Sequence, residues 1–257
     1  MLRRLSVVIF GAAIVFLAAD PSYAFRDHIA AAWTLDEGSG NVIHDISGNG
    51  NDGELTGGAE WVDGKFSKAL DFDGSTGYIE VPFDESMRVI NQGDFTLAAW
   101  FRPDEIPPEN KEVFQQGDKN GTGRTWLLVH SSNEIHSFLG GATTASGINV
   151  EPEEWYHTAV VVTEAGGTDT VQLYVNGEMS GAPGALGMED SEGSYFIGCH
   201  KNLTNFWDGI IDDVVLISKA LDEAEVKDLM TNGVAAGVAV QPAGKLAVSW
   251  GSIKGDK

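Results

Sequence analysis

The residues that could bind a metal ion are carboxylates and amides near turns and strand ends. Asp212 lies in a run where a period of two places it on the same face as Val214 and Leu216, and that face is expected to point inward. A buried carboxylate costs several kcal/mol unless a partner satisfies it. The sequence offers three partners for Asp212: a Ca²⁺ ion, a cluster of backbone N–H groups, or Lys219.

A loop of turn-forming residues could supply the further oxygen ligands that calcium requires. Its candidate ligands alternate along the chain: Asp45, Ser47, Asn49 and Asn51. This spacing matches the first half of an acidic calcium loop, although Thr56 stands where a bidentate glutamate would be needed. The alternative is a turn whose side chains bond its own backbone. Asp36, at the end of the first expected strand, is a further candidate. The predicted metal ligands are Asp212, Asp45, Ser47, Asn49 and Asp36.

Aromatic side chains beside amides indicate a different chemistry, the binding of sugars. Phe206 and Trp207 follow Asn202 and Asn205 in a polar stretch, and Trp126 lies in an expected strand. Large aromatic residues of a β-sandwich also fill its core, and this alternative stays open for both tryptophans. The predicted ligand-binding residues are Trp207, Phe206, Asn202, Asn205 and Trp126.

No constellation in the sequence predicts catalysis. The six histidines are scattered without metal-ligand spacing, and no serine, histidine and aspartate can be grouped. His157 is expected to be a packed strand residue. Cys199 is the only cysteine, so no intrachain disulfide can form, and we expect it to be a small core residue. The prediction is a protein that is not an enzyme.

Short strands dominate the pattern that must position these residues. Segments 155–163 and 171–175, joined by turn-forming residues, predict a hairpin, and Asn176 with Gly177 supplies the positive φ angles of a tight turn. Segments 126–130 and 134–139 predict a second hairpin. About ten to twelve such strands without a helical period predict an all-β sandwich or barrel. The polar segment 104–124 is expected to be a long surface connection.

One helix should close the domain. Asp222 and Glu225 have the spacing of a capping box, Leu221 and Val226 occupy the staple positions, and Gly233 stands where a C-cap glycine belongs. These signals predict one short amphipathic helix. The predicted domain covers residues 25–232. In the tail 233–257, segments 237–240 and 246–250 have the pattern of a small hairpin, which would either add to a sheet edge or be the remnant of a linker.

The beginning of the chain has the three regions of a secretory signal peptide. Arg3 and Arg4 precede an apolar run over residues 5–19, and a small-x-small cleavage site ends at Ala24. We therefore expect residues 1–24 to be removed and the protein to be secreted, extracellular or periplasmic, without membrane insertion. The full chain carries 38 acidic and 16 basic residues, a formal charge of −22. Such a charge disfavours nucleic acid and anionic membranes as partners.

Seven motifs stand in order along the chain: WTLDEG (33–38), DISGNGNDG (45–53), KALDFDG (68–74), FTLAAW (95–100), WYHTA (155–159), LYVNG (173–177), and GIIDDV (209–214) with KAL (219–221). Together they resemble the laminin-G-like, concanavalin A-like jelly-roll family, specifically its bacterial secreted branch. The resemblance implies two stacked antiparallel sheets, one of them concave, in a module that usually binds without catalysis. Members bind sugars, proteins or calcium, so the family indicates the shape better than the ligand.

Two site types known in this family are not recognisable here. Glucanases of the same fold carry three carboxylates at alternate positions of one strand, and no strand of this sequence has them. The pentraxin branch binds calcium just after the strand that ends here at Gly198, where this chain has Cys199, His200 and Lys201. We therefore predict a secreted module that recognises extracellular or cell-surface carbohydrate; Ca²⁺ would be a structural cofactor if the candidate carboxylates bind a metal and not backbone groups. A protein-binding adhesion domain is the alternative, and a glycoside hydrolase is less favoured.

Overall fold

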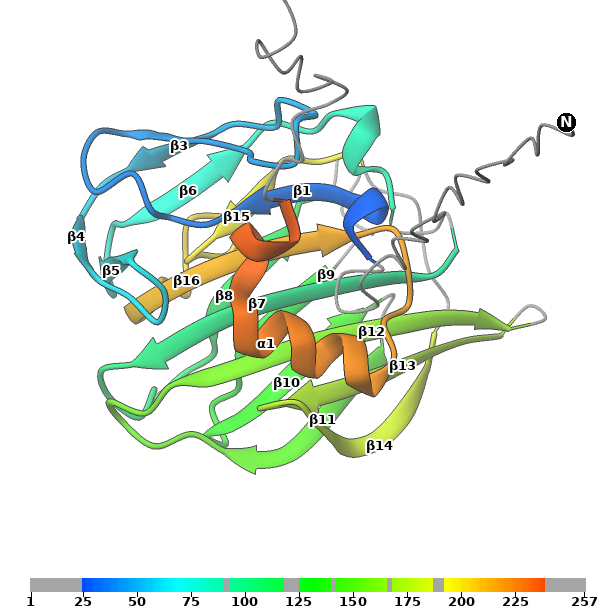
Figure 1. The fold of residues 1–257 in the computed structure, drawn as a ribbon. Helices are drawn as coiled ribbons and strands as arrows, with labels where there is room; N and C mark the ends of the chain where they lie inside the picture. Colours follow the sequence, from blue (N-terminus) through cyan, green and yellow to red (C-terminus); the bar gives the residue numbers. More distant parts are fainter. Residues whose placement is uncertain are drawn as a thin grey trace, which may run out of the picture.

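Two antiparallel sheets of eight strands each stack face to face (Figure 1). The computed structural model describes residues 25–89, 93–117, 125–139, 142–165, 168–186 and 192–238, without the side chains of residues 125, 126, 142, 165, 168, 169, 185, 186, 237 and 238. The expected signal peptide, most of the expected terminal hairpin and the side chain of Trp126 therefore lie outside the described part. The predicted all-β jelly-roll sandwich with one C-terminal helix is confirmed.

The first sheet, sheet A, contains the central predicted hairpin. Its strands, in order across the sheet, are β14 (Glu178–Leu186), β13 (Thr168–Val175), β12 (Tyr156–Ala165), β7 (Phe95–Pro103), β16 (Asp208–Ile217), β5 (Lys68–Asp73) and β4 (Ala59–Asp63), while β1 (Ile29–Trp33) also pairs with β16. Asn176 and Gly177 join β13 to β14 with φ angles of 50° and 79°. Both are positive, so the predicted tight turn is confirmed.

The second sheet, sheet B, contains the second predicted hairpin. Its strands, in order, are β11 (Ala142–Asn149), β10 (Glu134–Leu139), β9 (Thr125–Val129), β8 (Lys111–Gln116), β15 (Tyr195–Ile197), β6 (Tyr78–Val81), β3 (Gly53–Thr56) and β2 (Val42–Ile43). Two short 3₁₀ turns, η2 (Arg26–His28) and η3 (Glu85–Met87), complete the described elements before the helix.

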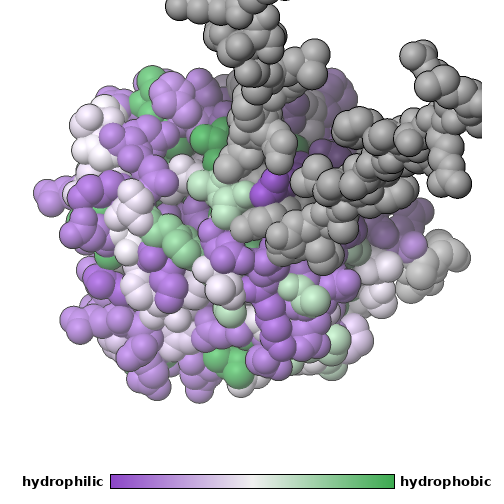
Figure 2. Space-filling model, in the orientation of Figure 1, coloured by the Kyte–Doolittle hydropathy of each residue, from purple (hydrophilic) through white to green (hydrophobic). Residues whose placement is uncertain are grey.

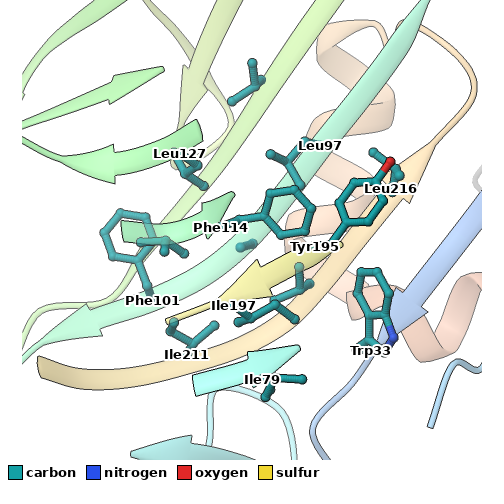
Figure 3. Close-up of a cluster of buried hydrophobic side chains, with 14 of the residues drawn as sticks. Trp33, Ile79, Leu97, Phe101, Phe114, Leu127, Tyr195, Ile197, Ile211 and Leu216 are labelled. Atoms are coloured by element: carbon teal, nitrogen blue, oxygen red, sulfur yellow. The ribbon is translucent and has the colours of Figure 1, made fainter. Parts of the chain in front are cut away.

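The core lies between the two sheets, because alternate residues of each strand point inward. In β7, Phe95, Leu97 and Phe101 are fully buried in this layer, and Figure 3 shows Leu97 and Phe101 there. Ile79 of β6 and Tyr195 of β15 meet them from sheet B. The intervening residues of each strand must then point to the outer face of its sheet, since side chains alternate with a period of two.

The helix α1 (Glu223–Val238) covers the outer face of sheet A (Figure 1). The capping box is formed: the Glu225 N–H donates to Asp222 Oδ1 at 2.9 Å, and the Asp222 N–H donates to Glu225 Oε2 at 3.1 Å. Gly233 has a φ of 73° at a kink, as expected for a C-cap glycine, but helical turns continue beyond it to Val238. No helix among the described residues is long and apolar enough to span a membrane.

The expectation for the polar segment 104–124 was wrong. The segment 104–124, expected to be a surface connection, contains β8 in the middle of sheet B. Its polar residues Glu112, Gln115 and Gln116 are almost completely buried. Polar residues at these positions do not produce the apolar alternation that predicts a strand. They are buried because a later loop of the chain packs on them.

Candidate functional site

Asp212 is buried on the outer face of sheet A and not in the core between the sheets. It lies opposite Trp100, whose strand neighbours on each side point into the core. The pairing of β16 with β7 shifts between Asp212 and Val215, and Asp213 has a φ of 46°. This bulge adds one residue, so that Val214 points inward while Asp212 does not. The predicted inward orientation of Asp212 was wrong for this reason.

Backbone N–H groups are the partners of Asp212. The N–H groups of Lys65 and Phe66 donate to its Oδ2 atom at 2.8 and 3.0 Å. Lys219, another candidate partner, instead forms an ion pair with Glu225. Burial raises the pKa of Asp212 to about 8, although the bonds from Phe66 and Lys65 favour the charged form. Of the three partners considered from the sequence, the contacts favour the backbone cluster.

His157 lies close by on the same face, as the packed strand residue that was predicted. Its ring is 5.2 Å from that of Trp100, and the side chain is buried. Burial, and then the charge of Lys65, lowers the pKa of His157 to about 3. The Lys65 ammonium lies 4.1 Å from the centre of the Trp100 ring. A neutral histidine, a tryptophan and a lysine thus anchor the loop that precedes β5.

The loop around Asp45 uses its oxygens for hydrogen bonds within the chain. Asp45 Oδ1 accepts from the Ser47 N–H and from an N–H of β1, and Oδ2 accepts from the Asn51 N–H and from Ser47 Oγ. The amides of Asn49 and Asn51 donate to the Ala30 carbonyl oxygen at 2.9 and 3.1 Å. These contacts correspond to the alternative interpretation, a turn that bonds its own backbone and the adjacent strand.

The predicted calcium ligands do not fit a calcium ion in this arrangement. Asp36 Oδ1 accepts from the Lys68 N–H at 2.9 Å, so it too serves a backbone donor. Calcium requires six or more oxygen ligands around one point. Within the described residues, no three histidine, cysteine, aspartate or glutamate side chains gather where they could hold a metal. We therefore derive no function through a metal.

Trp207, the first of the predicted sugar-binding residues, is a core residue. It is 1% exposed and packs edge to face against Phe101, with ring centres 5.3 Å apart. The backbone N–H of Trp207 donates to the Gly198 carbonyl oxygen, and its backbone carbonyl oxygen accepts from the Gly74 N–H. These bonds fix the backbone so that the ring enters the sandwich. The prediction of Trp207 as a sugar platform was wrong.

Phe206 is brought next to two aromatic residues that the sequence analysis did not single out. The Tyr78 ring lies 6.4 Å from Phe206 and 6.3 Å from Phe196. Tyr78 comes from β6 and Phe196 from β15, and both alternate with core residues, so they occupy the outer face of sheet B. We call Tyr78, Phe196 and Phe206 the aromatic trio. The period-two alternation around Ile79 and Ile197 was the signal that could have identified it.

Polar side chains adjoin the aromatic trio. Glu80 shares the outward face of β6 with Tyr78, and Glu54 of β3 is its partner across the strand pair. Thr56 is in the same way the partner of Tyr78. Paired residues of neighbouring strands have Cβ atoms only about 5 Å apart. The trio therefore lies beside two carboxylates and a hydroxyl group.

Asn205 anchors the loop that carries Phe206. Its side-chain amide donates to Glu112 Oε1 at 3.1 Å, and its carbonyl oxygen accepts from the Glu112 N–H at 3.1 Å. Gln115 accepts from the Lys201 N–H in the same loop. Glu112 is 1% exposed, and burial raises its pKa to about 7 although the Asn205 bond opposes this. Asn205 thus positions Phe206, while Asn202 is exposed.

The two outer faces differ in what covers them. Helix α1 packs on sheet A, and the molecular surface on that side is largely hydrophilic, with scattered apolar residues (Figure 2). No described α-helix packs on the outer face of sheet B, although the loop that carries Asn205 bonds to the buried Glu112 and Gln115 there. We call the face of sheet B that is turned away from sheet A the open face.

The edge strand β4 is flanked by a strongly acidic hollow with a volume of about 520 Å³. Its carboxylates are Glu60, Asp71, Asp73, Asp104 and Asp208. Burial raises the pKa values of Asp71 and Asp208, and neighbouring carboxylates raise them further. This part of the surface therefore disfavours additional negative charge.

A family model described as the concanavalin A-like lectin/glucanases superfamily matches residues 73–227, which is more than half of the chain. The match begins at the last residue of β5, so it includes the aromatic trio but not the first four strands of the fold. No curated protein matches the sequence.

Solved structures with the same fold are numerous, and three illustrate their range. Domain 4 of AbnA, a GH43 extracellular arabinanase from Geobacillus stearothermophilus, in complex with arabinotriose, has a TM-score of 0.58 and 19% identity, over 79% of this chain and 98% of its own. The binding domain of Paraclostridial Mosquitocidal Protein 1 has a TM-score of 0.66 and 18% identity, over 80% of this chain and 52% of its own. A structure of botulinum neurotoxin type C, whose cell entry depends on interaction with two ganglioside molecules, has a TM-score of 0.63 and 14% identity, over 80% and 51%. The chain thus spans about half of each toxin structure, and at these identities the likeness shows the fold alone.

Proposed function

The chain belongs to the concanavalin A-like lectin/glucanases superfamily, and we propose from this premise that it is a secreted, non-catalytic module that binds carbohydrate through the open face of sheet B. The aromatic trio is the observation that carries the proposal. Tyr78 and Phe206 are partly exposed, so their ring surface is available beside Glu54 and Glu80, while the buried Phe196 supports the Tyr78 ring from below. A sugar ring stacks on such planes while its hydroxyl groups bond to adjacent carboxylates.

The similar structures support a binding role in general terms. The arabinanase domain was solved with arabinotriose, and botulinum neurotoxin type C interacts with gangliosides. Another similar structure is the binding domain of botulinum neurotoxin DC in complex with rat synaptotagmin II, so this fold also supports protein partners. The partly exposed aromatic trio favours the carbohydrate for this chain.

The absence of catalysis is part of the proposal. A glycosidase needs a carboxyl group that stays protonated and reaches the glycosidic oxygen. On the open face, burial raises the pKa of Glu112. This carboxyl group is only 1% exposed, however, and it is bonded to Asn205. Such a group holds a loop and does not reach a ligand.

A glycan array, probed with the full chain without its first 24 residues, tests this function. We expect binding to at least one glycan, and loss of that binding in the variants Tyr78→Ala and Phe206→Ala. Trp155→Ala is the matched control, because Trp155 is a partly exposed aromatic residue on the side of sheet A, where it packs against Trp100. Equal binding by all three folded variants would contradict the assignment of the open face. Release of reducing ends from a bound glycan would contradict the absence of catalysis.

A further inference from the structure

A second hollow lies beside β4 and adjoins the open face. Its volume is about 430 Å³, within the range of about 300–1,000 Å³ that is usual for ligand clefts. The side chains that matter are those of Trp61, Asn41, Glu54 and Thr56. Trp61 packs against the core on one side and is only partly buried, and its Nε1–H donates to the Gly40 carbonyl oxygen at 3.3 Å. The hollow thus has a fixed aromatic wall beside an amide, a carboxylate and a hydroxyl group.

The hollow is connected to the aromatic trio through β3. Glu54 and Thr56 line the hollow, and they are the cross-strand partners of Glu80 and Tyr78. Neighbouring strands lie about 4.8 Å apart, so the two surfaces are one or two strand spacings from each other. A chain of linked sugar rings can therefore contact both, whereas a single ring contacts one of them.

A close contact between two turns fixes the position of the hollow. The Gly58 N–H donates to Thr76 Oγ1 at 2.9 Å, and Thr76 stands two residues before Tyr78 in the sequence. Gly57 has a φ of 80°, and a Cβ atom at this position would lie 2.0 Å from the Thr76 carbonyl oxygen. These contacts hold the rim of the hollow against the start of β6.

The charges around this surface select against anionic ligands. Glu54 and Glu80 occupy the strand pair between the hollow and the trio, and the acidic hollow lies on the other side of β4. Neither hollow has a lysine or an arginine among its described lining residues. A sulfate or carboxylate on the ligand would meet repulsion that decays only over the Debye length of about 10 Å.

We propose that the Trp61 hollow is a second sugar subsite, so that the hollow and the aromatic trio bind consecutive residues of one uncharged glycan chain. The inference rests on the proposed carbohydrate-binding function and specifies its ligand class. It assigns a role to Trp61 and Asn41, which the family match does not include because it begins at residue 73.

Titration calorimetry with uncharged oligosaccharides of increasing length tests the inference. The probes are arabinan, xylan and cellulose fragments from the monosaccharide to the tetrasaccharide. For the wild-type protein, affinity should rise with length until both surfaces are filled. Trp61→Ala should lose about tenfold affinity for the longest fragment, which is the loss expected when an anchoring aromatic residue is truncated. Its affinity for the shortest fragment should stay unchanged. Tyr78→Ala should lose affinity at every length.

Two further variants keep the test decisive. Trp61 contacts the core, so Asn41→Ala, at an exposed position, should show a smaller loss with the same dependence on length. Trp155→Ala should titrate like the wild type. If Trp61→Ala and Asn41→Ala retain the full gain with length while Tyr78→Ala loses binding, the second subsite is wrong and the proposed function stands. If no fragment binds the wild type while the array identifies a charged glycan, the ligand class is wrong and the proposed function stands; if the array also shows no glycan, both are wrong. A sulfated fragment that binds more tightly than its uncharged counterpart would overturn the ligand class.

Discussion

Glu112 gives the sharpest quantitative test of the site, because its burial couples the loop that carries Phe206 to pH. Burial raises the pKa of Glu112 from 4.5 to about 7 in the folded protein. The folded state therefore binds a proton more tightly than the unfolded state between these two values. Stability from this group is fully present below pH 4.5 and is lost as the pH rises through 7. At about 1.4 kcal/mol per pKa unit, the loss between pH 5 and pH 8 is about 2.5 kcal/mol.

The variant Glu112→Gln removes this proton and keeps an oxygen that can accept from Asn205. The amide N–H groups of the glutamine occupy the place of Oε2, which has no partner among the described residues. Burying these unpaired donors lowers the stability of the variant by about 1–3 kcal/mol at every pH. The informative quantity is therefore the change in stability with pH and not the stability itself. Buried groups such as Asp212 and His157 titrate equally in both proteins and cancel.

Urea unfolding of the two proteins at pH 5 and pH 8 measures this difference. The wild type should lose about 2.5 kcal/mol more than Glu112→Gln between the two pH values, and the denaturant slopes should agree. Glu154→Gln is a matched control, since it makes the same chemical change at an exposed glutamate. Parallel pH dependence in the wild type and in Glu112→Gln would refute the reasoning that the carboxyl group is buried and held by the loop.

Three further outcomes are expected. Trp207→Ala should lower the free energy of unfolding in urea by about 3–5 kcal/mol, because replacing a buried tryptophan leaves a cavity. A variant as stable as the wild type would contradict the burial of Trp207. Melting temperatures with chelator and with millimolar calcium should agree, because backbone N–H groups already bond to Asp45 and Asp212; a rise with calcium would show a metal site. Gly57→Ala should lower the melting temperature clearly more than Gly50→Ala. Both glycines have φ near 80°, but only Gly57 lacks room for a Cβ atom, and equal melting temperatures would contradict this.

Features that depend on neighbours in the sequence could be predicted, whereas features that depend on a distant segment could not. Asp222 and Glu225 satisfy each other within one helical turn, and Asn176 with Gly177 forms its turn locally. Asp212 was placed on the wrong face because a bulge changes the period of two at that residue, and the sequence carries no mark of it. Strand β8 was missed because a loop about 90 residues later supplies the partners of its polar side chains.

Phe206 and Trp207 show the same limit at the scale of two residues. Both were predicted to bind sugar, and one contacts the aromatic trio while the other fills the core. Their stretch precedes a strand and has no period that could separate inward from outward positions. Only the backbone bonds of Trp207 to Gly198 and Gly74 decide which ring enters the sandwich.

The acidic motifs of this chain follow from the needs of its loops. A loop that joins strands has N–H groups without ladder partners, and a short carboxylate can accept several of them. Asp73 Oδ1 accepts from three such groups, in Ser75, Thr76 and Gly77; burial opposes its charge, but these bonds lower its pKa to about 2. Asp45 and Asp212 serve their loops in the same way. Carboxylates that resemble metal ligands in the sequence thus accept hydrogen bonds from loop N–H groups, and a side chain such as Tyr78, on the outer face of a strand, is left for a ligand.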